Sequence, residues 1–207
     1  MRIITCTQGT PEWHAARAGI CTASRFADVM AKIKTGEAAD RRNYRADLVV
    51  ERLTRRPLET FTNKAMQQGI EREPFARMGY EARTAAIVQE VGFIRHDTLL
   101  AGASPDGLVE PRGGLEIKCP ERSAHLRYIQ QAAEPPEYRW QIQGQMWIAE
   151  LEFVDFVSYN PDFPEHLQLI VRRVQRDEDA IKRLSAEVAR FMDEVRAEAD
   201  AFCLEAA

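Results

Sequence analysis

Residues 102–120 read GASPDGLVEPRGGLEIKCP and place three ionisable side chains in a largely apolar stretch of the chain. Asp106 lies within S-P-D-G, a sequence that is typical of a tight turn. Further on, Glu116 and Lys118 flank a single apolar residue inside a run that reads as a strand. The stretch therefore predicts two strands joined around a turn, with two acids and one base inside a sheet.

The alternation of side chains along a strand sorts these residues by face. In GLEIKCP, Glu116 and Lys118 point to the same face. The opposite face carries the apolar side chains Leu115, Ile117 and Cys119. If this strand pairs with the one before it, Asp106 and Glu116 converge on one point, beside the ammonium group of Lys118.

Two converging carboxylates repel each other unless a positive charge neutralises them. A ligand set made of oxygen atoms favours Mg²⁺ or Mn²⁺ over zinc. Such a cation polarises a phosphoryl oxygen and lowers the pKa of a bound water. Lys118 beside it would orient that water or stabilise charge on the phosphorus. The arrangement therefore indicates metal-assisted hydrolysis of a phosphodiester.

A simpler interpretation of the same residues is a surface ion pair on a hairpin. An acid-x-Lys triplet occurs about once by chance in a chain of this length, so the triplet alone is weak. The upstream Asp106 and the apolar context favour the metal site. Gly113 and Gly114 are predicted to form a hairpin turn, and no G-x-x-x-x-G-K-[ST] phosphate loop is present.

Composition sets the broad class of the protein. A length of 207 residues suits a single domain over 1–207, and 45% hydrophobic residues suffice for a core. The formal net charge of −4 argues against a uniformly basic nucleic-acid binder. It remains compatible with a local basic groove, because fields are local and screened.

The cysteines and the apolar segments indicate a cytoplasmic protein that does not enter a membrane. The four cysteines are far apart and form no C-x-x-C pair, so we expect reduced thiols rather than a zinc site. The N-terminus shows no signal-peptide pattern, and no apolar run is long enough to span a bilayer.

The order of predicted elements gives an α/β (α+β) fold with a central mixed or antiparallel sheet flanked by helices. Apolar periodicity and turn signals predict helices at 11–17, 23–33, 43–55, 63–83, 122–132, 136–150 and 176–203, with Thr22 as the N-cap of the second. The same reasoning predicts strands at 87–96, 99–109, 114–119, 152–159 and 167–174.

The pattern D-x9-E-x-K from Asp106 to Lys118 resembles the signature of the PD-(D/E)XK nuclease superfamily. Further motifs in the same order are similar to those of the phage lambda exonuclease and YqaJ-like viral recombinase family. They are TPEWHAARAGICTASRFADVM at 10–30, MQQGIEREPFAR at 66–77, GASPDGLV at 102–109, LEIKCP at 115–120 and QIQGQMWIA at 141–149. One departure is Gln68, where relatives often have Trp before the glycine.

The resemblance implies a restriction-endonuclease-like core and a metal site that holds Mg²⁺, or Mn²⁺ in its place. Asp106, Glu116 and the backbone carbonyl of Ile117 would be ligands, and Glu73 would bind the metal directly or through water. Lys118 would be the catalytic lysine. The residues implied to grip a terminal 5′-phosphate are Arg17, Ser24, Ser104 and Gln143. Gln143 is preferred to Gln141 because it precedes Trp147 by one helical turn.

The family digests one strand of duplex DNA from the 5′ end, releases mononucleotides and leaves a 3′ single-stranded overhang. The resemblance implies 5′-phosphorylated duplex ends as substrate, a ring-shaped homotrimer, and a single-strand annealing protein as partner in phage-type recombination. A ring would allow a basic channel inside an acidic exterior. The basic runs 41–45 and 52–56 are candidates for that channel, or they are solvated helix faces.

Two other functions fit parts of the pattern. The first is a DNA endonuclease of the same superfamily, which would cut circular DNA. The second is a non-catalytic DNA-end-binding subunit of a recombination complex. The presence of Asp106, Glu116 and Lys118 together argues against the second, because a scaffold has no need of a metal site.

Overall fold

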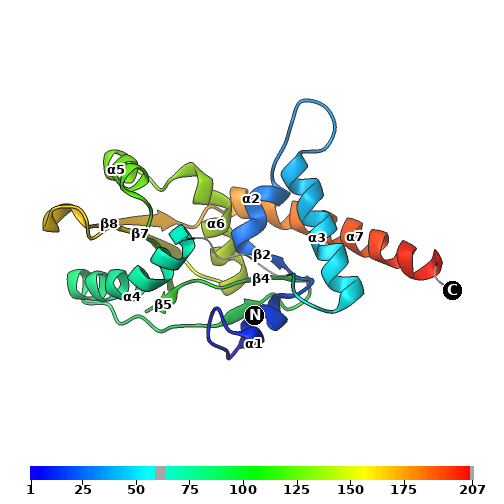
Figure 1. Ribbon diagram of the computed structural model, residues 1–207, viewed down its shortest axis with the longest axis horizontal. Coiled ribbons are helices and arrows are strands. Elements are labelled where there is room, and N and C mark those ends of the chain that lie inside the picture. The colour runs from blue at the N-terminus through cyan, green and yellow to red at the C-terminus, as the bar shows by residue number, and fades with distance from the viewer. Residues whose placement is uncertain (59–63, 206–207) are drawn as a thin grey trace.

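The computed structural model describes residues 1–58 and 64–205, in which two four-stranded mixed sheets are covered by helices (Figure 1). The strands are β1 (Arg2–Ile4), β2 (Cys21–Thr22), β3 (Phe93–Arg95), β4 (Ala101–Ala103), β5 (Gly107–Val109), β6 (Gly113–Lys118), β7 (Phe153–Tyr159) and β8 (Leu169–Gln175). One sheet has the order β1-β3-β4-β2 and the other β5-β6-β7-β8. The pairs β2–β4 and β6–β7 are parallel, and the others are antiparallel. The predicted α/β class is confirmed, with two mixed sheets where one was expected.

Apart from α2, the helices lie close to their predicted positions. They are α1 (Pro11–Arg17), α2 (Phe26–Val29), α3 (Ala39–Thr54), α4 (Lys64–Thr84), α5 (Arg122–Gln130), α6 (Arg139–Ala149) and α7 (Glu178–Glu205). The predicted first residue of α4, residue 63, lies outside the described residues. Along the described part of the chain, no helix combines the length and the apolar character needed to cross a membrane.

The expected helix at 23–33 is much shorter in the structure. A 3-10 turn (Ala23–Arg25) leads into α2, which has only four residues. Thr22 does not cap it through its side chain. Its hydroxyl lies 3.3 Å from that of Ser24, and its backbone N–H donates to the Tyr44 hydroxyl at 2.9 Å. Thr22 therefore joins strand β2 to α3 instead of starting a long helix.

Gly113 and Gly114 are not the hairpin turn that the sequence suggests. They open β6 and pair with Val109 and Leu108 of β5. A Cβ atom at Gly113 would lie 2.3 Å from the Phe153 ring, and one at Gly114 would lie 2.7 Å from a Leu151 methyl. Glycine suits both positions because neighbouring side chains pack directly onto the strand.

Strand β6 separates two packed layers, as its alternation predicts. Leu115 and Ile117 pack with Ala76 and Tyr80 of α4 in one apolar cluster. Glu116 points to the other face, towards α6. The larger core lies on that side and joins α2, α3, α6 and α7 to both sheets.

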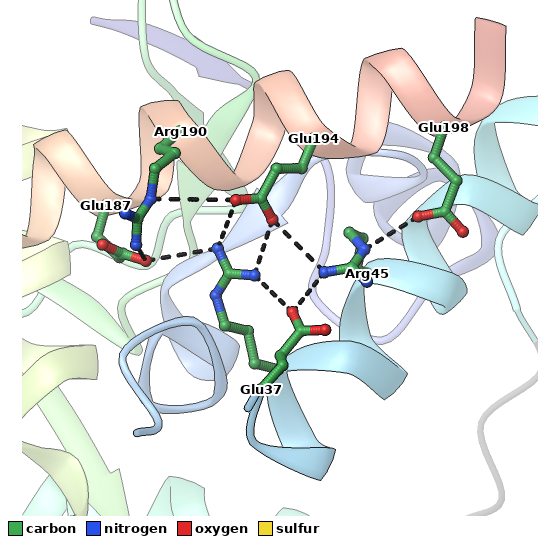
Figure 2. A network of polar contacts seen from close by, with 7 residues as sticks. Glu37, Arg45, Glu187, Arg190, Glu194 and Glu198 are labelled. Carbon is green, nitrogen blue, oxygen red and sulfur yellow. Dashed lines mark hydrogen bonds and ion pairs between the residues drawn. The ribbon is translucent and has the colours of Figure 1, made fainter. Parts of the chain in front are cut away.

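Helices α3 and α7 pack against each other at the end of the molecule away from α4 and α5 (Figure 1). Arg41 is only 8% exposed and lies between carboxylates: its guanidinium is 2.6 Å from Glu37 and 2.7 Å from Glu194. Arg45 bonds Glu37 and Glu198 in the same network, which Figure 2 shows. In the run 41–45, these two arginines therefore hold α3 to α7 and do not supply free positive charge to a DNA channel.

We expect Arg41→Ala to lower the free energy of unfolding by about 2–4 kcal/mol, because it leaves partly buried carboxylates without their partner. Arg190 is the matched control, since it pairs with the same Glu187 and Glu194 but its side chain is 63% exposed. Arg190→Ala should cost less than about 1 kcal/mol. Urea denaturation of both variants measures the difference, and equal losses would contradict the assignment.

Candidate active site

Asp106 lies where the chain passes from β4 of one sheet to β5 of the other. Its backbone N–H donates to the Leu115 carbonyl at 2.9 Å, which continues the β5–β6 pairing. Its carboxylate accepts from the Ile117 N–H at 2.6 Å. These two hydrogen bonds fix the carboxylate against β6, so the S-P-D-G segment connects the sheets rather than closing a hairpin.

The Glu116 carboxylate is 1% exposed and is surrounded by donors. Lys118 Nζ lies 2.5 Å from Oε1, and Gln141 Nε2 donates to the same oxygen at 2.6 Å. Gln145 Nε2 donates to Oε2. A buried carboxylate needs such compensation, because desolvation is costly for an ionised group.

Helix α4 brings Glu73 to the site from the other side of β6. A pocket of about 450 Å³ is lined by Glu73, Ile117 and Lys118, together with other residues of α4 and Tyr138. Arg77, one helical turn further on, donates to Glu73 at 2.7 Å. The predicted residues Glu73, Asp106, Glu116, Ile117 and Lys118 therefore gather around one end of β6.

A hydrogen bond to the buried carboxylate of Asp155 anchors α4 in this position. The Tyr80 hydroxyl donates to Asp155 of β7 at 2.8 Å. Asp155 is 1% exposed and also accepts two hydrogen bonds of 2.8 Å from Arg173 of β8. This bidentate arrangement is the strong form of an arginine–carboxylate contact. It fixes α4 on the sheet and so fixes the distance of Glu73 from β6.

The electrostatics of the site show an excess of negative charge. Burial, and then the charge of Glu116, raise the pKa of Asp106 well above its usual range, although Lys118 opposes the shift. Burial also raises the pKa of Glu73. Burial alone would lower the pKa of Lys118, but Glu116 and Asp106 outweigh it and raise that pKa. Lys118 therefore stays protonated and can act as a donor and a positive charge.

The residues present fit a hard divalent cation. The carboxylates of Asp106 and Glu73 each accept a hydrogen bond through one oxygen. The second oxygen of each carboxylate has no hydrogen-bond partner among the described residues. A cation would relieve the repulsion that raises the pKa of Asp106. Over residues 1–58 and 64–205, no three His, Cys, Asp or Glu side chains are arranged closely enough to hold an ion as they stand. In this arrangement, Lys118, Gln141 and Gln145 supply the hydrogen bonds to the Glu116 carboxylate.

Three of the four predicted phosphate-binding residues form a second cluster, and Trp13 links them. The Arg17 guanidinium lies 3.7 Å from the centre of the Trp13 ring, and the Trp13 indole N–H donates to Ser104 at 2.9 Å. Arg17 also donates to Ser24 at 3.4 Å. Burial lowers the pKa of Arg17 to about 10, against the opposing effect of Tyr44 and the charge of Glu51. No carboxylate of the described residues lies within ion-pair distance of Arg17. An arginine without a carboxylate partner suits an anionic ligand.

The hydrogen bonds of Gln143 go to residues outside this cluster. Its amide nitrogen donates to the Gln175 carbonyl at 3.0 Å, and its oxygen accepts from the Asp177 N–H at 2.9 Å. Gln143 therefore joins α6 to the start of α7. Gln141 and Gln145, four residues apart on the opposite face of α6, contact Glu116. That i, i+4 spacing was the signal in QIQGQ that sequence reasoning missed.

Comparisons with known proteins identify relatives of this chain. Residues 12–152 match the family model of the YqaJ-like viral recombinase domain. The structure is similar to LHK-Exo, an alkaline exonuclease from Laribacter hongkongensis, with 44% identity, 95% of this chain and 98% of that chain covered, and a TM-score of 0.89. One crystal structure of LHK-Exo is a complex with dAMP.

A phage-related exonuclease from Haemophilus somnus 129PT shares the fold, with a TM-score of 0.65, 17% identity, and 86% of this chain and 96% of that chain covered. No curated protein sequence matches the chain.

The fold and the site define a nuclease with a restriction-endonuclease-like core, a class that typically uses a divalent metal. More narrowly, the chain belongs to the YqaJ-like viral recombinase domain family. The family expected from the sequence is confirmed.

We expect Asp106→Asn to raise the free energy of unfolding by about 1–2 kcal/mol in EDTA, because it removes a charge that its surroundings disfavour while keeping an oxygen to accept from Ile117. Lys118→Met should lower stability, because it leaves Glu116 without its cation. Urea denaturation in EDTA tests both, with the exposed Asp193→Asn as a near-neutral control. A destabilised Asp106→Asn would contradict the electrostatic account.

Proposed function

We propose that the protein is an exonuclease that needs Mg²⁺, or Mn²⁺ in its place, and digests one strand of duplex DNA from the 5′ end. It would release 5′-mononucleotides and leave a 3′ single-stranded overhang. The observation that carries the proposal is the convergence of Asp106, Glu116 and Lys118 at β5 and β6. Asp106 lies two residues along the chain from Ser104, which belongs to the second cluster with Arg17 and Ser24.

The spacing between the two clusters supports attack at a DNA end. Ser104 and Asp106 are separated only by Pro105, so their Cα atoms lie about 7 Å apart at most. A terminal phosphate held by Arg17, Ser24 and Ser104 would place the next phosphodiester near the carboxylates. That arrangement favours release of one nucleotide at a time. The dAMP complex of the related LHK-Exo supports a nucleotide monophosphate as product.

The side chains divide the chemistry between them. When bound by Asp106, Glu116, the Ile117 carbonyl and Glu73, a divalent cation would polarise the scissile phosphoryl group and acidify a water. Protonated Lys118 would donate to the attacking water or to a phosphoryl oxygen. Arg17 would hold the terminal phosphate through charge-assisted hydrogen bonds, with neutral donors from Ser24 and Ser104.

The same proposal includes the assembly and the setting that the family implies. The protein would form a ring-shaped homotrimer, work with a single-strand annealing protein, and act in the cytoplasm of a bacterial host during phage-type recombination. Helix α4 supports a protein contact, because Phe75 and Met78, three residues apart on one face, are exposed by 60% and 63%. Adjacent exposed apolar side chains are typical of interaction sites.

Digestion of linear duplex DNA in Mg²⁺ tests the function. We expect loss of one strand from its 5′ end, faster with a 5′-phosphate than with a 5′-hydroxyl. Lys118→Ala should reduce the rate by about 100-fold or more. Arg17→Ala should remove the preference for a 5′-phosphate over a 5′-hydroxyl, because the guanidinium group that would bind the phosphate is lost. The exposed Arg190→Ala variant should retain that preference.

Closed circular DNA is the control substrate. An end-dependent enzyme leaves it intact, so cleavage of the circle would favour the endonuclease instead. Binding of duplex ends with no cleavage of any substrate would favour the non-catalytic subunit.

A further inference from the structure

Gln145 is a buried side chain of α6 to which the proposed reaction gives no role. It is 1% exposed, and its Nε2 donates to Oε2 of Glu116. Its carbonyl oxygen, Oε1, is buried and has no hydrogen-bond partner among the described residues. Buried polar atoms normally have a hydrogen-bond partner. The lack of one in the described part of the chain suggests that Oε1 of Gln145 binds a group that is absent from the protein chain itself.

The hydrogen bonds at Glu116 show what Gln145 does. A carboxylate offers about four lone-pair sites, two on each oxygen. On Oε1, Lys118 and Gln141 occupy both sites. On Oε2, Gln145 occupies one, and no other group among the described residues donates a hydrogen bond to this oxygen. The remaining open position of Glu116 is therefore on the oxygen that Gln145 holds.

The orientation of the Gln145 amide follows from chemistry. With Oε1 turned towards Glu116, two acceptor oxygens would face each other, so the N–H must face the carboxylate. The amide oxygen and nitrogen share one carbon and lie within about 2.5 Å of each other. The unpartnered oxygen is therefore also close to Glu116, where water bound to a cation could donate to it. Mg²⁺ keeps several of its waters in protein sites.

We propose that Gln145 is a positioning residue of the metal site: its Nε2 fixes Oε2 of Glu116 for a divalent cation, and its Oε1 accepts from a water of that cation. This inference rests on the proposed function, since it concerns the same cation. It differs from the role of Gln141, whose hydrogen bond lies on the oxygen that Lys118 also occupies.

The test is the affinity of Gln145→Met for Mn²⁺, measured without DNA from the electron paramagnetic resonance signal of free Mn²⁺. Methionine is close to glutamine in shape but lacks both polar atoms. We expect Kd to rise about tenfold or more, as is usual when a group that orients a metal ligand is lost. On duplex DNA, kcat should fall while KM stays unchanged, because Gln145 acts through Glu116 and does not contact DNA.

Gln143→Met is the matched control, on the same helix and from an equally buried side chain at 2% exposure. It should lower the thermal midpoint but keep the wild-type Kd for Mn²⁺, because Gln143 bonds to Gln175 and Asp177. If Gln145→Met does not fold, Gln145→Asn replaces it, since its amide is drawn back from Glu116 by one carbon; it too should weaken Mn²⁺ binding.

A Gln145 variant with wild-type Kd, or a Gln143→Met variant that loses Mn²⁺ equally, would overturn the role of Gln145. These outcomes differ from failure of the proposed function, in which wild-type protein itself neither binds Mn²⁺ nor cuts DNA.

Discussion

The register of β5 on β6 is the constraint on which the site depends. It is set at Asp106, whose N–H donates to Leu115 and whose carboxylate accepts from the Ile117 N–H at 2.6 Å. A shift of one residue would turn Glu116 towards the apolar layer under α4 and expose Leu115 to the polar side. Because one face of β6 packs against α4 and the other against α6, this register is strongly specified. The same pairing that builds the sheet therefore places the acids.

Holding these charges together costs stability, and other parts of the fold offset that cost. Lys118 and two glutamines of α6 satisfy Glu116, while Arg77 accompanies Glu73 on α4. The bidentate Arg173–Asp155 pair and the Tyr80 hydroxyl hold α4 on the sheet. Sites that concentrate like charge in a low-dielectric setting are expected to be functional rather than stabilising. The surrounding fold thus stabilises a site whose own charges repel one another.

The strand that carries Glu116 and Lys118 could be predicted from the sequence, because the alternation of its side chains is a local pattern. Alternation in GLEIKCP fixed the faces of Glu116 and Ile117, and the family resemblance suggested Glu73. Long-range arrangement was harder to foresee. The assignment of Arg41 and Arg45 to a candidate channel did not anticipate that they meet the acidic face of α7, some 150 residues further along the chain. The number of sheets depends on non-local pairing in the same way. In QIQGQ, a pattern based on Trp147 favoured Gln143, whereas the face of α6 that meets Glu116 carries Gln141 and Gln145.

The most direct test of the account is a crystal structure of the protein with Mn²⁺ and a 5′-phosphorylated duplex end, with the metal located by its anomalous scattering. We expect Mn²⁺ between Asp106 and Glu116, in contact with the Ile117 carbonyl. We also expect the terminal phosphate to contact Arg17, Ser24 and Ser104. Mn²⁺ at another position, or a DNA end bound away from β5 and β6, would contradict the account.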